Sequence, residues 1–364
     1  MTVGYHSPMP PARTGVAGYS EALVRALAGL MRVTVNSSRY SDVELWHLGN
    51  NALHRPILEK SLQRPGVAVL HDAVLHHFYL GGNDEERYLE EFVYNYGEWS
   101  RGLARELWKR RAHSAGDPEY FRYPMLRRVI EASRCVVVHN PMAAAFVREH
   151  VPEARVEEIP HLFDAPEPPP QFVIARVRER FGPGAVVFGL FGHLRESKRV
   201  LQVLHAFARV RRDHPHAWLV AAGEMASQDL ARAAAPYWTN PGIVRLPYLS
   251  ESEFWKWAHA VDVCINLRNP CAGETSGIMV RFAGIGRCVV ATDGAEISRW
   301  PQDACLRVDA GLAEEEMLEA YLRWACSTPA AVREIGHRAA AHIAAHHAPA
   351  RVARLWVDLL ERLA

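Results

Sequence analysis

The sequence lacks several features that would place it in a specialised class of protein. Its net charge is only +1, from 42 Lys and Arg against 41 Asp and Glu. That balance argues against a general nucleic-acid-binding protein, which needs a basic excess. No apolar run approaches the roughly 18–20 residues that span a bilayer. The first residues show no charged segment followed by an apolar one, so we expect a cytoplasmic protein.

Paired cysteines are also missing. The sequence contains no Cys-x-x-Cys pair, and its six cysteines lie at positions 135, 264, 271, 288, 305 and 326. This usage is typical of small apolar core residues in a reducing compartment, rather than of a zinc site or a disulfide framework. The phosphate-binding motif G-x-x-x-x-G-K-[ST] is absent, and no repeat of about 20–50 residues is visible.

What the sequence does contain is a regular alternation of short apolar runs with helical patterns. Runs without polar alternation favour parallel strands whose two faces are both covered by helices. Helical patterns lie between them, as in 19–30 and 198–211. The expected strands are 2–6, 32–36, 43–48, 67–71, 135–139, 155–159, 186–191, 217–222, 243–246, 262–267, 288–292 and 305–308.

A proline-rich break divides this pattern into two halves. The stretch Asp164-Ala-Pro-Glu-Pro-Pro-Pro-Gln cannot continue a helix or a central strand, because proline lacks the backbone N–H. We therefore predict an α/β protein with two doubly wound, Rossmann-like domains that face a cleft lined by strand C-termini and helix N-termini. The expected divisions are a first domain at 1–165, a linker at 166–184, a second domain at 185–328, and C-terminal helices at 329–364.

One region departs from the alternation. Residues 78–123 hold eleven of the 34 aromatic residues, mixed with many charges. We expect a helical insert with its own small core, and the alternative is an aromatic wall for a sugar or lipid acceptor. The run Trp108-Lys-Arg-Arg is expected to be a solvated helix face, and the alternative is peripheral contact with an anionic membrane.

An anion site is predicted at the start of the second half. The strand at 186–191 is followed by Gly192-His193-Leu-Arg195-Glu-Ser-Lys198 and then by a helix. Glycine lets a ligand approach the backbone closely, and a helix start offers unpaired N–H groups and partial positive charge. Arg195 and Lys198 add full charges, so the pattern favours a phosphate or diphosphate. The alternative is an ordinary basic helix start.

A second set of candidate residues follows the strand at 262–267. Glu274 stands just before a helix that Thr275 or Ser276 can cap. A carboxylate there can accept hydrogen bonds from sugar hydroxyls, while Ser276, Gly277 and Ile278 offer backbone N–H groups. The alternative is that Glu274 only complements the helix dipole.

Polar residues also follow strands of the first half. Gly15 and Gly18 open the helix after the first strand, and Asn50 and Asn51 follow the third. We expect both pairs to lie at the cleft, since helix N-termini and strand C-termini line it.

The segment His71-Asp72-Ala-Val-Leu-His76-His77 follows the strand at 67–71. We predict that it belongs to a polar, proton-handling sugar site, in which His71 and Asp72 are catalytic and His76 binds the acceptor. A metal site is the alternative, but no matching ligand cluster lies nearby in the sequence.

These motifs, in this order, resemble the GT-B fold and the family-4 retaining glycosyltransferases over essentially the whole chain. Ile159-Pro-His-Leu-Phe-Asp164 resembles the family's Ile-Pro-Asn-Gly-Val-Asp, and Gly192 and Lys198 match its Gly-Arg-Leu-x-x-x-Lys, with His193 in place of arginine. Glu274 matches the first glutamate of the E-x7-E motif, whereas Phe282 stands where the second glutamate holds the nucleotide ribose.

The resemblance implies transfer of a sugar from a nucleotide diphosphate sugar to a hydroxyl acceptor, with retention of configuration and without a metal or other cofactor. Glu274 would act in catalysis together with His71 and Asp72, and His71 would lie across the cleft from the donor site. Gly15, Gly18 and Thr275 would bind the donor, and Asn50, Asn51 and His76 the acceptor. The helix at 349–363 would pack back on the first domain. The expected acceptor is a glycan, a lipid-linked compound or a small molecule. The alternatives are a GT-B-like protein that binds a nucleotide or a partner without catalysis, and a nucleotide-sugar epimerase.

Overall fold

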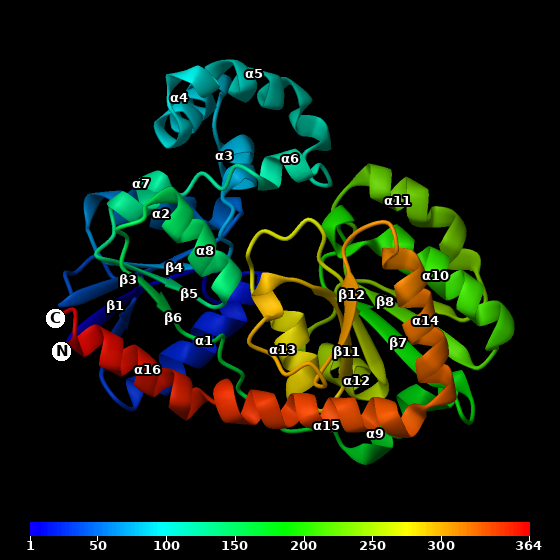
Figure 1. Ribbon diagram of the computed structural model, residues 1–364. Helices are drawn as coiled ribbons and strands as arrows, with labels where there is room; N and C mark the ends of the chain where they lie inside the picture. The colour runs from blue at the N-terminus through cyan, green and yellow to red at the C-terminus, as the bar shows by residue number, and fades with distance from the viewer.

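The computed structural model describes residues 1–364 and contains two α/β domains, each built on a six-stranded parallel sheet (Figure 1). The strand orders are β2-β1-β3-β4-β5-β6 and β12-β11-β10-β7-β8-β9. The expected fold class is confirmed, and every expected strand forms within one residue of its predicted ends. The strands are Thr2–His6 (β1), Arg32–Val35 (β2), Val43–Leu48 (β3), Val67–Leu70 (β4), Cys135–Val138 (β5), Val156–Glu158 (β6), Val186–Phe191 (β7), Ala217–Ala222 (β8), Ile243–Leu246 (β9), Val263–Asn266 (β10), Cys288–Asp293 (β11) and Leu306–Asp309 (β12).

Sixteen α-helices cover or extend these sheets, and none is long and apolar enough to cross a membrane. The helices are Gly15–Ala28 (α1), Arg55–Gln63 (α2), His76–Gly82 (α3), Glu85–Tyr96 (α4), Arg101–Arg110 (α5), Pro118–Phe121 (α6), Arg127–Glu131 (α7), Pro141–His150 (α8), Gln171–Arg178 (α9), Val200–Asp213 (α10), Gln228–Ala234 (α11), Glu251–Ala260 (α12), Gly277–Gly284 (α13), Glu314–Ser327 (α14), Pro329–His346 (α15) and Pro349–Glu361 (α16).

Alternate residues of each strand point to opposite faces of its sheet, and helices bury both faces. In the second domain, α10 and α14 cover one face, while α12, α13 and α15 cover the other. In the first domain, α2, α7 and α8 cover one face. The other face is covered by α1 together with α16. Burial on both faces explains why the strands read as continuous apolar runs.

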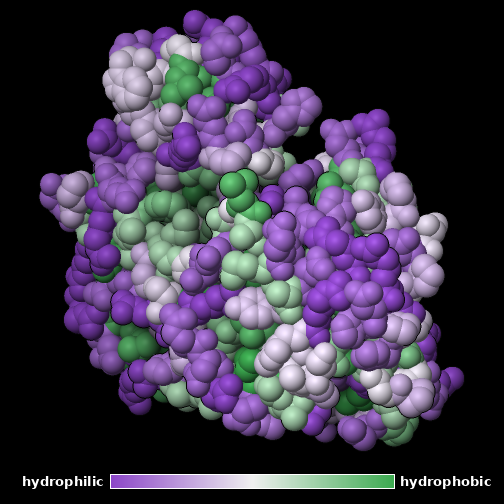
Figure 2. Space-filling view, turned by 45° about the vertical axis from the view of Figure 1, so that its right-hand side comes forward, coloured by the Kyte–Doolittle hydropathy of each residue, from purple (hydrophilic) through white to green (hydrophobic).

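The aromatic region between β4 and β5 forms the helices α3 to α6, as a helical insert. In both views it stands above the rest of the molecule, and in Figure 2 a notch separates it from the second domain (Figures 1 and 2). It does not have a core of its own. Its buried aromatics Tyr88, Phe92 and Tyr120 pack in one cluster with Trp46 and Leu70 of the first sheet. The insert therefore extends the first domain's core upward.

The expected linker is shorter in the structure than the sequence indicated. Residues 161–170 have no regular structure, but α9 begins at Gln171 and packs on α12 of the second domain. The Pro-rich stretch alone therefore makes the first crossing between the domains. The chain crosses back between α15 and α16, and the two crossings are joined where Phe163 N donates to His347 O at 2.8 Å.

The last helix belongs structurally to the first domain. α16 lies beside α1 (Figure 1), and its apolar side chains pack on Val3, Tyr5 and Leu23. Trp356 has 0% of its surface exposed and is among the largest fully buried side chains. Without α16, one face of the first sheet would be partly open to solvent.

We therefore expect Trp356→Ala to lower the free energy of unfolding by about 3–5 kcal/mol, the range for removing a large buried side chain. Urea unfolding of the full chain measures this loss. Asp358→Ala, at an exposed position of the same helix, should change the value by no more than about 0.5 kcal/mol. Equal effects of the two substitutions would show that α16 is not packed in solution.

Candidate functional site

The carboxyl ends of the two sheets meet through the loop between β10 and α13. Ala73 N, just after β4, donates to Ala272 O of this loop at 2.8 Å. Asn140, just after β5, donates its side-chain amide to Gly273 O at 2.9 Å and to Thr275 Oγ1 at 3.0 Å. Gly273 has φ +71, and a Cβ there would lie 2.9 Å from Ala73 Cβ, so this close approach requires glycine. The loop thus fixes residues of both domains at one place.

Two arginines pair with Glu274, in this loop, and a lysine lies near both of them. Arg268 Nη1 lies 3.0 Å from Glu274 Oε1, and Arg195 Nη2 lies 3.4 Å from the same oxygen. Lys198 is only 5% exposed, and both arginines act on its pKa. The predicted residues Arg195, Lys198 and Glu274 are therefore brought together, and the structure adds Arg268.

The sequence predicted a helix that begins at Lys198, but the structure does not have one there. Lys198 ends a short 3-10 helix, Glu196–Lys198, and α10 begins only after Arg199. Its ammonium turns back and donates to Phe191 O at the end of β7. Gly192, with φ +85, leaves room for it, since a Cβ there would lie 2.8 Å from Lys198 Nζ. Burial, then the charges of the nearby arginines, lowers the pKa of Lys198 well below its ordinary value.

Two carboxylates from different domains face these bases. Burial alone would raise the pKa of Glu274, but Arg268 and Arg195 outweigh it and hold the pKa below its ordinary value. Burial, followed by the negative charge of Glu274, raises the pKa of Asp72. Asp72 Oδ2 accepts a hydrogen bond from Asn50 N at 2.7 Å. The cleft therefore holds three basic side chains and two acids, one of which raises the pKa of the other.

The start of α13 completes the second-domain side. Ser276 caps the helix by accepting from Met279 N at 3.3 Å, and it also accepts from Arg268 Nη2 at 3.1 Å. Gly277 and Ile278 are half-buried, and as the first residues of the helix they have no intrahelical acceptor for their N–H groups. Thr275 instead bonds Asn140 of the first domain. His193, in the loop after β7, is exposed.

The two predicted glycines of the first domain lie at the start of α1. Gly15 begins α1, Gly18 lies in its first turn, and both are exposed. A Cβ at either position would meet no atom within 4 Å. The fold itself therefore does not demand glycine at these two positions.

The three residues predicted to bind an acceptor each have a partner within the protein, and their acceptor contacts stay a prediction. His76 is fully buried, with Nε2 2.8 Å from Tyr88 OH, so it offers no exposed surface to an acceptor in this structure. Asn50 Oδ1 accepts from Phe78 N at 2.7 Å and fixes the start of the insert. Asn51 caps a 3-10 helix by accepting from Leu53 N at 3.0 Å.

Phe282, at the position of the second glutamate in the resemblance, is a core residue. It is fully buried, and its ring centroid lies 5.0 Å from that of Phe191 and 5.8 Å from that of Phe254. No polar side chain could replace it there without loss of packing. The half-buried Arg281 precedes it and pairs with Glu251 of α12.

His71 belongs to a buried group of rings, which we call the histidine cluster. Its members come from the carboxyl ends of neighbouring strands and from α1. They are Tyr5, Tyr19, His47, His71, His139 and His161.

One hydrogen bond in the cluster orients His71. His71 Nε2 lies 3.0 Å from His47 Nδ1, so only one of these two nitrogens carries a hydrogen when both rings are neutral. The other nitrogen of His71, Nδ1, has no protein partner and is not fully enclosed. It is therefore the atom of His71 that a ligand can reach.

Burial keeps these histidines neutral. It lowers the pKa of His47 and of His71 well below the ordinary value, and it lowers that of His139 to about 4 and of His161 to about 3. Tyr5, Tyr19, His47 and His139 each keep a buried polar atom without a partner. Each such atom lowers the free energy of unfolding by about 1–3 kcal/mol. The cluster therefore destabilises the fold beside the cleft.

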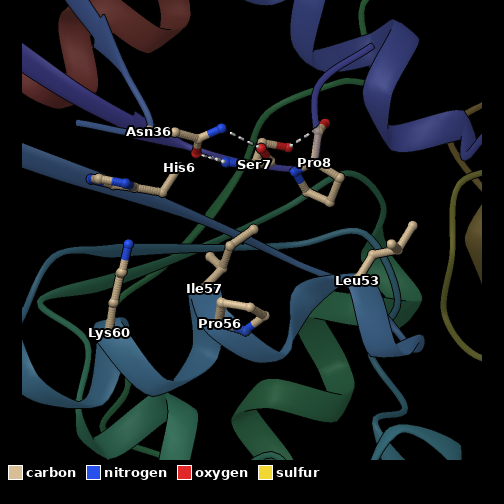
Figure 3. A pocket seen from close by; sticks show the side chains of 8 residues that line it. All are labelled: His6, Ser7, Pro8, Asn36, Leu53, Pro56, Ile57 and Lys60. Atoms are coloured by element: carbon tan, nitrogen blue, oxygen red, sulfur yellow. Dashed lines mark hydrogen bonds between the residues drawn. The ribbon is translucent and has the colours of Figure 1, made fainter. Parts of the chain in front are cut away.

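A cavity of about 230 Å³ opens at the carboxyl ends of β1 and β2 (Figure 3). Asn36 and Ser7 form one wall through mutual hydrogen bonds, and the Lys60 side chain rises toward His6 on the other side (Figure 3). It contains none of the predicted site residues. It is also smaller than the roughly 300–1,000 Å³ of most small-molecule sites, so we assign it no role.

Sequence reasoning missed Arg268, Asn140 and most of the histidine cluster. Arg268 and Asn140 each follow directly after a strand that was expected, at 262–267 and at 135–139. The rule that ligands bind beyond the carboxyl ends of parallel strands would have found both. His47 lies inside its strand, so no comparable signal indicated it.

The buried histidines predict a loss of stability in acid. In the unfolded chain they titrate near pH 6.5, whereas in the fold the pKa of His139 is about 4 and that of His161 about 3. Between these values the unfolded state binds protons that the folded state excludes. These histidines therefore contribute their full share to the free energy of unfolding above pH 6.5, and that contribution decreases as the pH is lowered toward 4.

Urea unfolding at pH 4.5 to 7.5 tests this. We expect His161→Asn to reduce the slope of stability against pH by up to about 1.4 kcal/mol per pH unit. His337→Asn, at an exposed position, should leave the slope unchanged. If neither variant changes the slope, residues other than His161 cause the loss of stability in acid.

Comparison with known proteins identifies the fold of the chain. No family model matches the sequence, and no curated protein matches it by sequence. HepE of Anabaena, solved with UDP and glucose, superposes with a TM-score of 0.66 at 12% identity over 100% of both chains. Sucrose-phosphate synthase of Thermosynechococcus elongatus gives 0.69 at 13% identity over 100% of this chain and 98% of that one. WaaG, a glycosyltransferase involved in lipopolysaccharide biosynthesis, gives 0.63 at 12% identity over 97% and 99%. With its two facing Rossmann-like domains, the chain has the GT-B fold.

Proposed function

We propose that the chain is a glycosyltransferase that moves a sugar from a nucleotide diphosphate sugar to a hydroxyl acceptor. The observation that carries this is the convergence of Arg195, Lys198 and Arg268 in the cleft, where Glu274 is the one carboxylate that pairs with the two arginines. A diphosphate would supply the missing negative charge. HepE has been solved with UDP-glucose, which makes a UDP-sugar the first donor to test.

The same geometry supports the chemistry of the step. Negative charge grows on the diphosphate as the bond to the sugar breaks, and fixed cations aimed at that charge stabilise the transition state. In the structure Glu274 pairs with both Arg195 and Arg268 and offsets part of their positive charge. A bound diphosphate would take over both arginines and leave the Glu274 carboxylate to accept hydrogen bonds from sugar hydroxyls.

The first domain would approach the sugar from the other side. His71 offers Nδ1, Asp72 lies within electrostatic reach of Glu274, and the open surface at Gly15 and Gly18 accepts a ligand close to the backbone. Because burial keeps His71 neutral, it would act through a hydrogen bond and not as a cation. The raised pKa of Asp72 suits a group that exchanges a proton with a hydroxyl.

We extend the proposal to retention of configuration, as the resemblance implies. We also propose that transfer needs no metal, because three basic side chains provide the positive charge that a metal would otherwise supply. The acceptor hydroxyl would enter beneath the helical insert. Trp99 is the most exposed aromatic side chain of the insert, at 77%, so it is the first candidate for contact with a lipid-linked acceptor or a membrane surface.

Binding of UDP tests the anion site directly. We expect Arg268→Gln and Lys198→Met to weaken UDP binding roughly 10- to 100-fold, because each removes a charged hydrogen-bond donor. Titration calorimetry at moderate salt measures this. Lys256→Met, the same change on α12 where Lys256 pairs with Glu253, should leave the affinity unchanged. Equal affinities in all four proteins would remove the proposed phosphate site.

Uridine and UDP-glucose separate the alternatives. UDP should bind more tightly than uridine, and UDP-glucose should be hydrolysed slowly without an acceptor. Tight binding with no turnover for any acceptor would favour a binding protein without catalysis. Conversion of UDP-glucose to an isomeric nucleotide sugar would favour an epimerase.

Glu274→Gln tests the division of roles. We expect turnover of UDP-glucose to fall at least 100-fold, by roughly 3 kcal/mol of transition-state stabilisation. UDP should bind as tightly as before or more tightly, because a negative charge has left a site for an anion. Glu253→Gln on α12 serves as the matched control. A parallel loss of UDP affinity would assign Glu274 to the phosphates or to the fold.

A further inference from the structure

A group of metal-ligating side chains lies on the second domain, away from the cleft. His214 follows directly after α10, and His216 directly precedes β8. Cys326 lies in the last turn of α14. One ligand atom from each of the three lies within 4.8 Å of those of the other two. Since β8 begins beside this group, the group is at the amino-terminal edge of the sheet, opposite the edge that faces the cleft.

These ligand atoms have no other partner in the protein. The rings of His214 and His216 make no hydrogen bond or ion pair, and their centroids lie 5.7 Å apart at an interplanar angle of 80°. Cys326 is a free cysteine. Both imidazoles are half-buried and the thiol is 8% exposed, so the group is sheltered but open to an ion from solvent.

Neighbouring charged residues hold the two ligand-bearing segments together. The Arg211 side chain donates to Ala217 O at 2.6 Å and to Pro215 O, which fixes the backbone of the His-Pro-His loop. Arg323, one turn before Cys326 on α14, pairs with Asp213 at 2.5 Å. This pair fastens the loop to the helix that carries the cysteine. The three ligands are therefore positioned by contacts that do not use the ligand atoms themselves.

We propose that His214, His216 and Cys326 bind one divalent cation of the zinc type. Two imidazole nitrogens and one thiolate form a borderline-soft donor set that suits Zn²⁺ or Co²⁺ and not Mg²⁺ or Ca²⁺, which prefer oxygen. A tetrahedral ion at 2.0–2.3 Å from each ligand would need the ligand atoms to approach one another by no more than about 1 Å, a shift within the reach of small rotations of the half-buried histidine side chains. Water takes the fourth position.

Binding forms one metal–sulfur bond and two metal–nitrogen bonds, and it releases the thiol proton to solvent. Burial raises the pKa of Cys326 to about 11, so the metal displaces this proton. The ion would join α14 to the α10–β8 loop on the far side of the sheet from the donor site. It is independent of the proposed glycosyl transfer.

Metal titration of the chelator-treated full chain tests the proposal. We expect one Zn²⁺ per chain by elemental analysis after dialysis, and one Co²⁺ per chain with the visible and near-ultraviolet absorption of a tetrahedral cobalt thiolate. Cys326→Ala should abolish the cobalt–thiolate band, and His214→Gln with His216→Gln should weaken Zn²⁺ binding at least tenfold. His337→Gln, an exposed histidine on α15, should change neither.

Several results would overturn the site. They are absence of bound metal in the folded wild-type chain, a 1:1 complex that survives the paired histidine substitutions, and a cobalt spectrum without the thiolate band. If Cys326→Ala fails to fold, the paired substitutions at the half-buried histidines give the same answer without touching the core.

Discussion

The docking of the β10–α13 loop on the first domain is the contact on which the candidate site depends. Two anchors hold it, Ala73 N to Ala272 O and the Asn140 amide to Gly273 O and Thr275 Oγ1. They place Glu274, which belongs to the second domain by sequence, beside Asp72 of the first. Without this contact the two acids would titrate separately, and each domain would carry only half of a site.

Basic side chains outnumber acidic ones around this contact, and this excess favours binding of an anion. Arg195, Lys198 and Arg268 crowd together, and burial with mutual repulsion lowers the pKa of Lys198. Glu274 relieves part of the repulsion and in doing so uses both of its oxygens on protein donors. An anion that replaces Glu274 at the arginines would relieve more of it. Under the proposed function, a bound phosphate would therefore take the place of the internal carboxylate at the arginines.

The fold could be predicted from sequence because its strands are buried on both faces and so appear as uninterrupted apolar runs. The same local reasoning pointed to Lys198 and Glu274, which lie in the segments between β7 and α10 and between β10 and α13. It failed where a role depends on contacts between distant segments. His76 looked like a site residue from its neighbours His71 and Asp72, but the insert encloses it against Tyr88. His47 lies inside its strand, and only the folded structure brings it to His71.

The connections between the domains restrict how the site can open. Only two segments of chain cross between them, and these segments are bonded to each other through Phe163 N and His347 O, and through His347 Nδ1 and His161 O at 2.5 Å. A rotation that preserves both crossings must pivot near this point. His161 is also a member of the histidine cluster, which reaches the cleft at His71. The pivot and the cleft therefore share one buried, neutral group of rings, so a movement of the domains that disturbs His161 acts on the same packing that orients His71.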